Sequence, residues 1–154
     1  MSARLGFILL AHSALDRAAQ VARFLAAGGS PLVIHVDART SAADYDGLVQ
    51  ALADLPEVRF CRRHRCEWGT WSLVAAMQSA SEMLLREFPK VERVYAMSGA
   101  CLPLRPVAEL QSWLDRHPDT DFIESVNVAD VNWTKGGLSE ERFTLHFPIG
   151  FKRN

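Results

Sequence analysis

The chain alternates short, continuous apolar runs with longer segments in which apolar residues recur at helical spacing. A continuous apolar run of strand length is typical of a strand buried on both faces, as in a parallel sheet covered by helices. This alternation predicts an α/β fold with a mostly parallel sheet and right-handed crossovers. The expected strands are residues 5–11, 32–37, 58–61, 94–97 and 121–125, and the expected helices are residues 16–27, 42–55, 71–88 and 107–116.

Glycine, serine and proline mark where the expected helices begin and end. Gly28 and Gly29 follow the first helix, where a left-handed cap is common, and Ser41 is suited to cap the second. Pro56 and Pro89 follow the second and third helices, because proline cannot continue a helix. These residues support the boundaries that the apolar spacing indicates.

The periodic pattern ends near residue 125, and residues 126–154 are polar and aromatic with no predicted helix. We therefore expect an α/β domain over residues 1–125, and a second region that begins at 126–154 and continues in a longer chain. A composition of 49% hydrophobic and 23% charged residues is globular, and a net charge of −1 gives no reason to expect nucleic acid as a partner. The apolar run at residues 5–11 is too short to span a membrane and lacks a signal-peptide cleavage pattern.

Three cysteines, Cys61, Cys66 and Cys101, are an odd number at irregular spacing. A disulfide framework is not expected from this pattern, and a structural zinc site would need a fourth ligand at suitable spacing. A reducing, cytoplasmic setting is the simplest interpretation.

The segment that follows the fourth expected strand is a candidate ligand loop. The apolar residues 94–97 give way to Ser98 and Gly99, where the backbone can turn tightly. In an open α/β sheet, ligands bind beyond the carboxyl ends of the strands. We expect the Cys101 thiol in this loop to be buried beside Leu102 rather than to act as a nucleophile.

Asp37 ends the second expected strand, and two interpretations of it stay open. A carboxylate at this place can accept hydrogen bonds from ribose hydroxyls or a base edge, or it can cap a helix or serve a turn before Ser41. His35 lies on the same face of the strand, but two ligands without a third do not make a metal site. Residues 11–14 contain no glycine, which excludes the dinucleotide and P-loop phosphate fingerprints after the first strand.

Residues 62–71, Arg-Arg-His-Arg-Cys-Glu-Trp-Gly-Thr-Trp, are the most unusual local composition in the chain. In one interpretation Trp68 and Trp71 contact an aromatic or sugar ring while the arginines lie near anionic oxygens. In the other, the arginines form a solvated loop and both tryptophans pack against the start of the long helix.

Five segments together resemble the branching-enzyme superfamily of glycosyltransferases. This superfamily contains the core-2 and I-branching β-1,6-N-acetylglucosaminyltransferases, the peptide O-xylosyltransferases and related proteins. The segments occur in the family's order and cover nearly the whole chain. They are Leu9–His12, Ile34–Asp37, Cys66–Val74, Met97–Arg105 and Asp121–Ser125.

The resemblance implies a GT-A fold whose Rossmann-like first half binds a UDP-sugar. It implies an inverting transfer without the metal-binding Asp-x-Asp motif, and therefore a site without a metal or another cofactor; the chain is accordingly expected to carry no Asp-x-Asp triplet. By position, the nucleotide-sugar contacts fall at Ala11, His12, Asp37, Cys66, Glu67, Trp68, Ser98 and Gly99. The acceptor-side candidates are Glu124, Lys135 and Arg142.

Two departures bear on the mechanism that the resemblance implies. Many relatives carry Asp where this chain has Cys101, so the loop is expected to shape the site rather than to act as an acid. The family's catalytic carboxylate and the Arg/Lys pair that neutralises the diphosphate correspond to positions beyond Asn154, so no catalytic base is assigned here.

The leading hypothesis is the donor-binding part of an inverting, metal-independent UDP-sugar glycosyltransferase. It would transfer N-acetylglucosamine or xylose to a glycan or another hydroxyl acceptor, although residues 1–154 alone are expected to be inactive. The alternative is a non-catalytic nucleotide-sugar-binding or assembly module. We also expect an exposed apolar face where further chain would pack, which would favour self-association.

Overall fold

The structure is a computed structural model that describes residues 5–122 and 126–131. The chain divides into two units, residues Met1–Pro118 and Asp119–Asn154. The first unit contains a four-stranded sheet in the order β3-β2-β1-β4, in which every pairing is parallel. Its strands are β1 (Leu5–Ala11), β2 (Leu32–Val36), β3 (Val58–Phe60) and β4 (Arg93–Ser98). The predicted parallel α/β fold is thereby confirmed.

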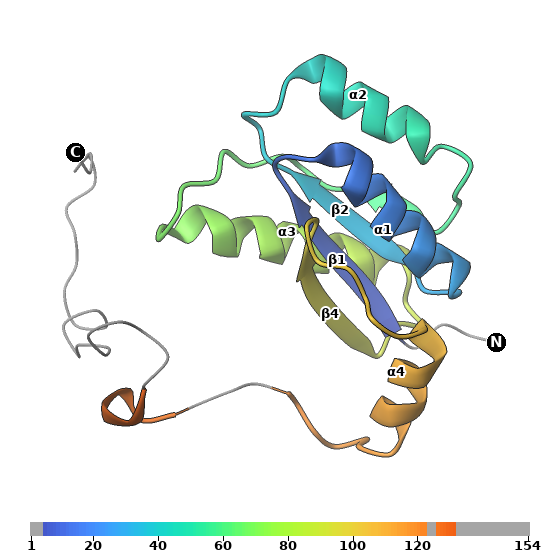
Figure 1. Ribbon diagram of the computed structural model, residues 1–154, viewed down its shortest axis with the longest axis vertical. Coiled ribbons are helices and arrows are strands. Elements are labelled where there is room, and N and C mark those ends of the chain that lie inside the picture. The colour runs from blue at the N-terminus through green and yellow to red at the C-terminus, as the bar shows by residue number, and fades with distance from the viewer. Residues whose placement is uncertain (1–4, 123–125, 132–154) are drawn as a thin grey trace. The chain divides into compact units, whose positions relative to one another are not determined.

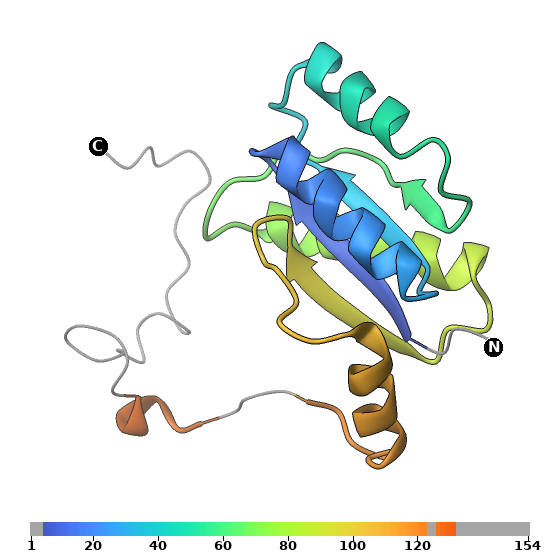
Figure 2. The ribbon, with the colours of Figure 1, turned by 45° about the vertical axis from the view of Figure 1, so that its right-hand side comes forward.

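Four helices connect or follow the strands of this unit. They are α1 (Leu15–Ala27), α2 (Ala42–Ala51), α3 (Trp71–Glu87) and α4 (Val107–Asp115). Helices α1 and α3 lie on opposite faces of the sheet (Figures 1 and 2). In the second unit a short 3-10 helix spans Val128–Asp130.

Two apolar clusters separate the faces of the sheet because neighbouring residues of a strand point in opposite directions. On one face, alternate residues of β1 such as Phe7 and Leu9 pack with Leu25 of α1, and this cluster also includes residues of α2 and α4. On the other face, Ile8 packs with Leu84 of α3. The two central strands are therefore buried on both faces, as their continuous apolar sequences predict.

The helix ends follow local chemistry. The Ser41 side chain accepts a hydrogen bond from the Asp44 N–H at 3.1 Å and caps α2, as predicted. The left-handed residue after α1 is Gly29, with φ of 78°, whereas Gly28 has φ of −76°. Helix α2 ends at Ala51, before the predicted residue 55, because residues 52–55 continue in tighter turns with hydrogen bonds between residues three apart.

Strand β4 forms as predicted but is not buried as its apolar sequence suggested. Val94 and Tyr95 are 39% and 46% exposed. In the described sheet β4 is an edge strand with β1 as its one neighbour, so less of its surface is covered than that of β1 or β2. Of the fifth predicted strand, residues 121 and 122 are not in a strand, and residues 123–125 lie outside the described part of the chain.

None of the helices described within residues 5–122 and 126–131 is both long enough and apolar enough to cross a membrane.

Candidate functional site

The predicted site residues of the first unit lie at or just beyond the carboxyl ends of the four parallel strands. Because the strands are parallel, these ends share one edge of the sheet. The end of β1 holds its neighbours there: the Ala11 carbonyl accepts from the Asp37 N–H at 2.9 Å, and the Leu10 carbonyl accepts from the Gly99 N–H at 2.8 Å. The structure thus connects the ends of β2 and β4 directly to the end of β1.

Gly99 lies where the backbone after β4 passes close to β1. A Cβ atom added to Gly99 would lie 3.1 Å from the Cβ of Ala11 and 3.4 Å from that of Ala18. A side chain at this position would require Ala11 or Ala18 to shift by a few tenths of an ångström. Ser98 precedes it, and its hydroxyl accepts from the Ala100 N–H at 3.2 Å. The absence of a side chain at Gly99 brings two predicted site positions, 11 and 99, into contact.

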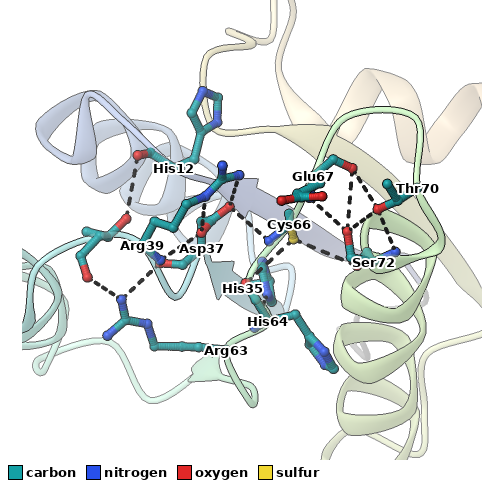
Figure 3. Close-up of polar contacts among 11 residues, drawn as sticks. His12, His35, Asp37, Arg39, Arg63, His64, Cys66, Glu67, Thr70 and Ser72 are labelled. Atoms are coloured by element: carbon teal, nitrogen blue, oxygen red, sulfur yellow. Dashed lines mark hydrogen bonds and ion pairs between the residues drawn. The ribbon is translucent and has the colours of Figure 1, made fainter. Parts of the chain in front are cut away.

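The Asp37 carboxylate connects the turn after β2 with the loop after β3 (Figure 3). Its Oδ1 accepts from the Arg39 backbone N–H at 2.8 Å and from the Arg39 Nε at 3.3 Å. Its Oδ2 accepts from the Arg39 Nη2 at 3.1 Å and from the Cys66 N–H at 3.2 Å. Asp37 is therefore part of a turn, and it does not cap α2, since Ser41 does so.

The surroundings of Asp37 favour its ionised form. Burial raises the pKa of this carboxyl, but the backbone and side-chain hydrogen bonds from Arg39, the Cys66 N–H and the Arg39 charge together outweigh it and lower the pKa. Asp37 therefore remains a carboxylate that accepts hydrogen bonds, and it is not a general acid near neutral pH.

A polar seam, defined as residues 35–40 and 63–66, continues the contact of β2 and β3 past the ends of the strands. The His64 N–H donates to the His35 Nε2 at 2.9 Å, and the His64 carbonyl accepts from the Ala38 N–H at 2.9 Å. Arg63 donates from Nη2 to the carbonyls of Asp37 at 2.9 Å and Thr40 at 2.5 Å. The arginines of this segment are thus not all solvated, because Arg63 holds the seam together.

The buried His35 acts as an acceptor within the seam. Because its Nε2 accepts from the His64 N–H, its imidazole is neutral in this arrangement. Burial lowers the pKa of His35, and the charges of His64 and Arg63 lower it further, while that of Asp37 raises it; the net shift is downward. His35 therefore serves as a hydrogen-bond acceptor, and the described residues contain no group of three or more His, Cys, Asp or Glu placed to hold a metal ion.

Trp68 lies on a braced turn before α3, and Trp71 is the first residue of that helix. The Glu67 carbonyl accepts from the Thr70 hydroxyl at 2.9 Å, and the Glu67 N–H donates to the Ser72 hydroxyl at 2.8 Å (Figure 3). Trp68 is 97% exposed and Trp71 is 68% exposed. The interpretation that both indoles pack against the long helix is therefore wrong, and the turn instead presents them to solvent.

The cysteines differ in their environments. Burial raises the pKa of the Cys61 thiol to about 11, and burial together with the Asp37 charge raises that of Cys66. Neither buried thiol is therefore activated as a nucleophile. Cys101 is exposed, so the prediction that its thiol is buried was wrong, because the loop after the edge strand β4 is left uncovered.

Two hollows adjoin the candidate site. One, of about 810 Å³, lies between the start of α1 and the length of α2 and includes His12, Arg39 and Thr40. The other, of about 1060 Å³, is an apolar groove between β4, the 101–106 loop and α4, and it includes Ser98. Thus neither hollow brings Ser98 together with His12, although Gly99 contacts Ala11.

The expectation of a chain without an Asp-x-Asp triplet is wrong. The sequence contains Asp44-Tyr45-Asp46 and Asp119-Thr120-Asp121. The first triplet is in the opening turn of α2, where residues two apart do not face each other, and the Asp44 carboxylate accepts from the Ser41 hydroxyl at 2.7 Å. The second lies in the other unit. The spacing alone therefore gives neither triplet a metal-binding role.

The acceptor-side candidates Glu124, Lys135 and Arg142 lie outside the described residues. Arg39 was not predicted as a site residue, and for Arg63 the sequence predicted only that the arginines of residues 62–71 lie near anionic oxygens or in a solvated loop. Arg39 could have been found from its spacing, because an aspartate commonly accepts the backbone N–H two residues later in a turn. Arg63 carried no such signal, since its partners lie 23 and 26 residues away.

The parallel sheet with helices on both faces first defines a class, a Rossmann-like α/β domain. The sequence profile of the Core-2/I-Branching enzyme family matches residues 5–144. The chain belongs to this family, which is one of glycosyltransferases, enzymes that move a sugar from an activated donor to an acceptor. A comparison with curated proteins gives no match.

Proposed function

We propose that residues 5–118 form the donor-binding part of an inverting, metal-independent glycosyltransferase that uses a UDP-sugar. The observation that carries this proposal is the meeting of Ala11, Asp37 and Cys66 at one edge of the sheet, with an ionised carboxylate already oriented by backbone N–H groups. A carboxylate at the end of a parallel strand is suited to ribose hydroxyls. The two exposed indoles are suited to the flat face of a base or a sugar.

The chemistry proposed is a direct displacement at the anomeric carbon. An acceptor hydroxyl attacks that carbon while a carboxylate base takes its proton, and the bond to the UDP oxygen breaks. Cationic side chains stabilise the departing diphosphate. We propose N-acetylglucosamine or xylose as the transferred sugar and a glycan or another hydroxyl group as the acceptor, with the base outside the residues described here.

Two further expectations belong to this proposal. Unpaired thiols at Cys61, Cys66 and Cys101 support a reducing compartment such as the cytoplasm. The exposed side chains of Tyr95, Leu102 and Leu104 line the apolar groove and are together called the β4 face; they support self-association through that face.

The proposal is tested by calorimetric titration of the folded protein with UDP, UDP-N-acetylglucosamine and UDP-xylose, with and without a chelator. We expect binding of the uridine nucleotides that the chelator leaves unchanged. If well-folded protein binds no uridine nucleotide, the donor site is refuted. If binding requires Mn²⁺ or Mg²⁺, the metal-independent mechanism is refuted, and the two Asp-x-Asp triplets become the residues to mutate.

A matched pair of variants tests whether Trp68 contacts the donor. Trp68 is 97% exposed, so Trp68→Ala should leave the unfolding midpoint unchanged while weakening UDP-sugar binding by roughly 10-fold, the loss expected of one stacking contact. Leu104→Ala, at another exposed side chain, should change neither quantity. Equal binding by all three proteins would remove Trp68 from the site.

A further inference from the structure

Asp37, the residue best placed to meet a ribose, already has a hydrogen-bond donor on each available side of its carboxylate. Two donors are backbone N–H groups, those of Arg39 at 2.8 Å and Cys66 at 3.2 Å. The other two belong to the Arg39 guanidinium, whose Nε lies 3.3 Å from Oδ1 and whose Nη2 lies 3.1 Å from Oδ2. Each carboxylate oxygen thus receives one backbone donor and one guanidinium donor. A ribose hydroxyl can reach Asp37 when one of these donors leaves.

The two kinds of donor differ in how easily they leave. The Cys66 N–H belongs to the polar seam, where neighbouring residues are held by the His35–His64 and Arg63–Asp37 hydrogen bonds, and the Arg39 N–H belongs to the same turn as Asp37. The Arg39 side chain is 52% exposed and borders the hollow of about 810 Å³. Its guanidinium can therefore exchange Asp37 for water without disturbing the backbone, and an ion pair of this exposure is weak.

The shape of the guanidinium contact matches that of a sugar diol. The guanidinium offers two N–H groups side by side, one to each carboxylate oxygen. Two neighbouring hydroxyls of a ribose can offer two O–H groups in the same paired arrangement, since each hydroxyl can act as a donor. Arg39 and a cis-diol are thus alternative occupants of the same two acceptor positions on Asp37.

We propose that Arg39 is an internal competitor of the donor nucleotide, occupying the two positions on Asp37 that the 2′- and 3′-hydroxyls of a uridine ribose take. Arg39 must swing away from Asp37 before a ribonucleotide binds, whereas the Arg39 and Cys66 backbone N–H groups keep the carboxylate oriented. The competition makes Asp37 select a ribose with both hydroxyls, because a single hydroxyl replaces only one of the two guanidinium contacts. This inference rests on the proposed function, since it takes the ligand to be a ribonucleotide.

The test compares the binding of uridine and 2′-deoxyuridine to four proteins by NMR titration: the unmodified chain, Arg39→Ala, Arg39→Lys and Arg17→Ala. Uridine carries no phosphate, so loss of a positive charge does not itself weaken its binding. Arg39→Ala should bind uridine roughly two- to fivefold more tightly, as expected when one half-exposed ion pair no longer competes. The gain for 2′-deoxyuridine should be smaller. Arg39→Lys should give an intermediate gain, because an ammonium group does not present the guanidinium fork.

Arg17→Ala removes an exposed arginine of α1 that lies outside the polar seam, and it should leave both affinities unchanged. Arg39→Lys decides the question if the alanine variant does not fold. Equal or weaker uridine binding by the folded Arg39 variants, in a chain that binds UDP, overturns the competitor role and leaves the donor site intact. If the unmodified chain and all the variants bind neither uridine nor UDP, both the donor site and the competitor role are refuted.

Discussion

The polar seam and the β4 face belong to the same sheet, but they differ in the burial and polarity of their side chains. In the seam, polar side chains such as His35 and Asp37 are buried and hydrogen-bonded to loop backbone. On the β4 face, apolar side chains such as Tyr95 and Leu104 are exposed. The seam is therefore a preorganised polar site, whereas the β4 face presents apolar surface of the kind that marks an interaction region.

This difference predicts how strongly substitutions in each region change the free energy of unfolding. Buried polar groups are costly to leave without partners, so the seam has a defined geometry and responds strongly to the loss of one group. Truncation of an exposed apolar side chain changes the free energy of unfolding little, because that side chain is not packed in the folded protein. Substitutions in the seam should accordingly alter folding much more than substitutions on the β4 face.

Truncation of Asp37 should have the largest effect. Asp37→Ala removes the acceptor of the Cys66 N–H and of the Arg39 N–H, and we expect a loss of about 2–4 kcal/mol in the free energy of unfolding. Asp46→Ala, the same substitution at an exposed position of α2, should change it by at most about 0.5 kcal/mol. Urea unfolding measures both. Equal effects of the two variants would mean that the seam contributes no more to stability than the surface does.

This expectation also limits how Asp37 can be used to study binding. Asp37→Ala would reduce UDP binding through the altered loop even if the carboxylate never touched the ligand. Variants of Arg39 are the cleaner probe, because the Arg39 side chain is half-exposed and its backbone N–H remains in every variant.

Acidification should produce an intermediate effect through His35. Its pKa is lowered in the folded protein, chiefly by burial, so the unfolded chain takes up a proton at a higher pH than the folded chain does. Stability should therefore fall as the pH drops below the ordinary histidine value of 6.5, with a slope of at most about 1.4 kcal/mol per pH unit from this residue. The sign follows because the unfolded state binds more protons in that range.

His35→Gln tests this assignment, since the glutamine amide oxygen can accept from the His64 N–H but does not titrate. Denaturant unfolding between pH 5 and pH 7.5 should give a shallower slope for the variant than for the unmodified chain. Parallel slopes would show that His35 is not the group responsible.

The smallest effect is expected on the β4 face. Leu104 is 95% exposed, so Leu104→Ser should change the free energy of unfolding by less than about 0.5 kcal/mol. Analytical ultracentrifugation alongside denaturant unfolding shows whether the face associates. A loss above about 1 kcal/mol at a concentration where the unmodified chain is a dimer would mean that Leu104 is covered by a second copy, which would reduce the contrast with the seam.

The sequence was sufficient for the order and type of the elements described in the first unit and for the family. Continuous apolar runs at 5–11 and 32–36 reflect burial on both faces, and the Ser41 cap depends on residues three apart. The parallel arrangement then places the predicted positions Ala11, Asp37 and Gly99 at one edge. These features depend on local patterns and on general rules of chain connection, which a single sequence carries.

Only the tertiary structure decided how the site residues are used. The pairing of Asp37 with the Cys66 N–H joins residues 29 apart, and no local pattern specifies that contact. The exposure of β4, Trp68 and Cys101 likewise depends on what covers each of them, which an apolar or aromatic residue type does not reveal. The sequence thus determined which residues reach the edge of the sheet. The folded chain determined that Arg39 and Cys66 already occupy the acceptor positions on the Asp37 carboxylate. The Cys66 contact forms between segments that are brought together only by folding.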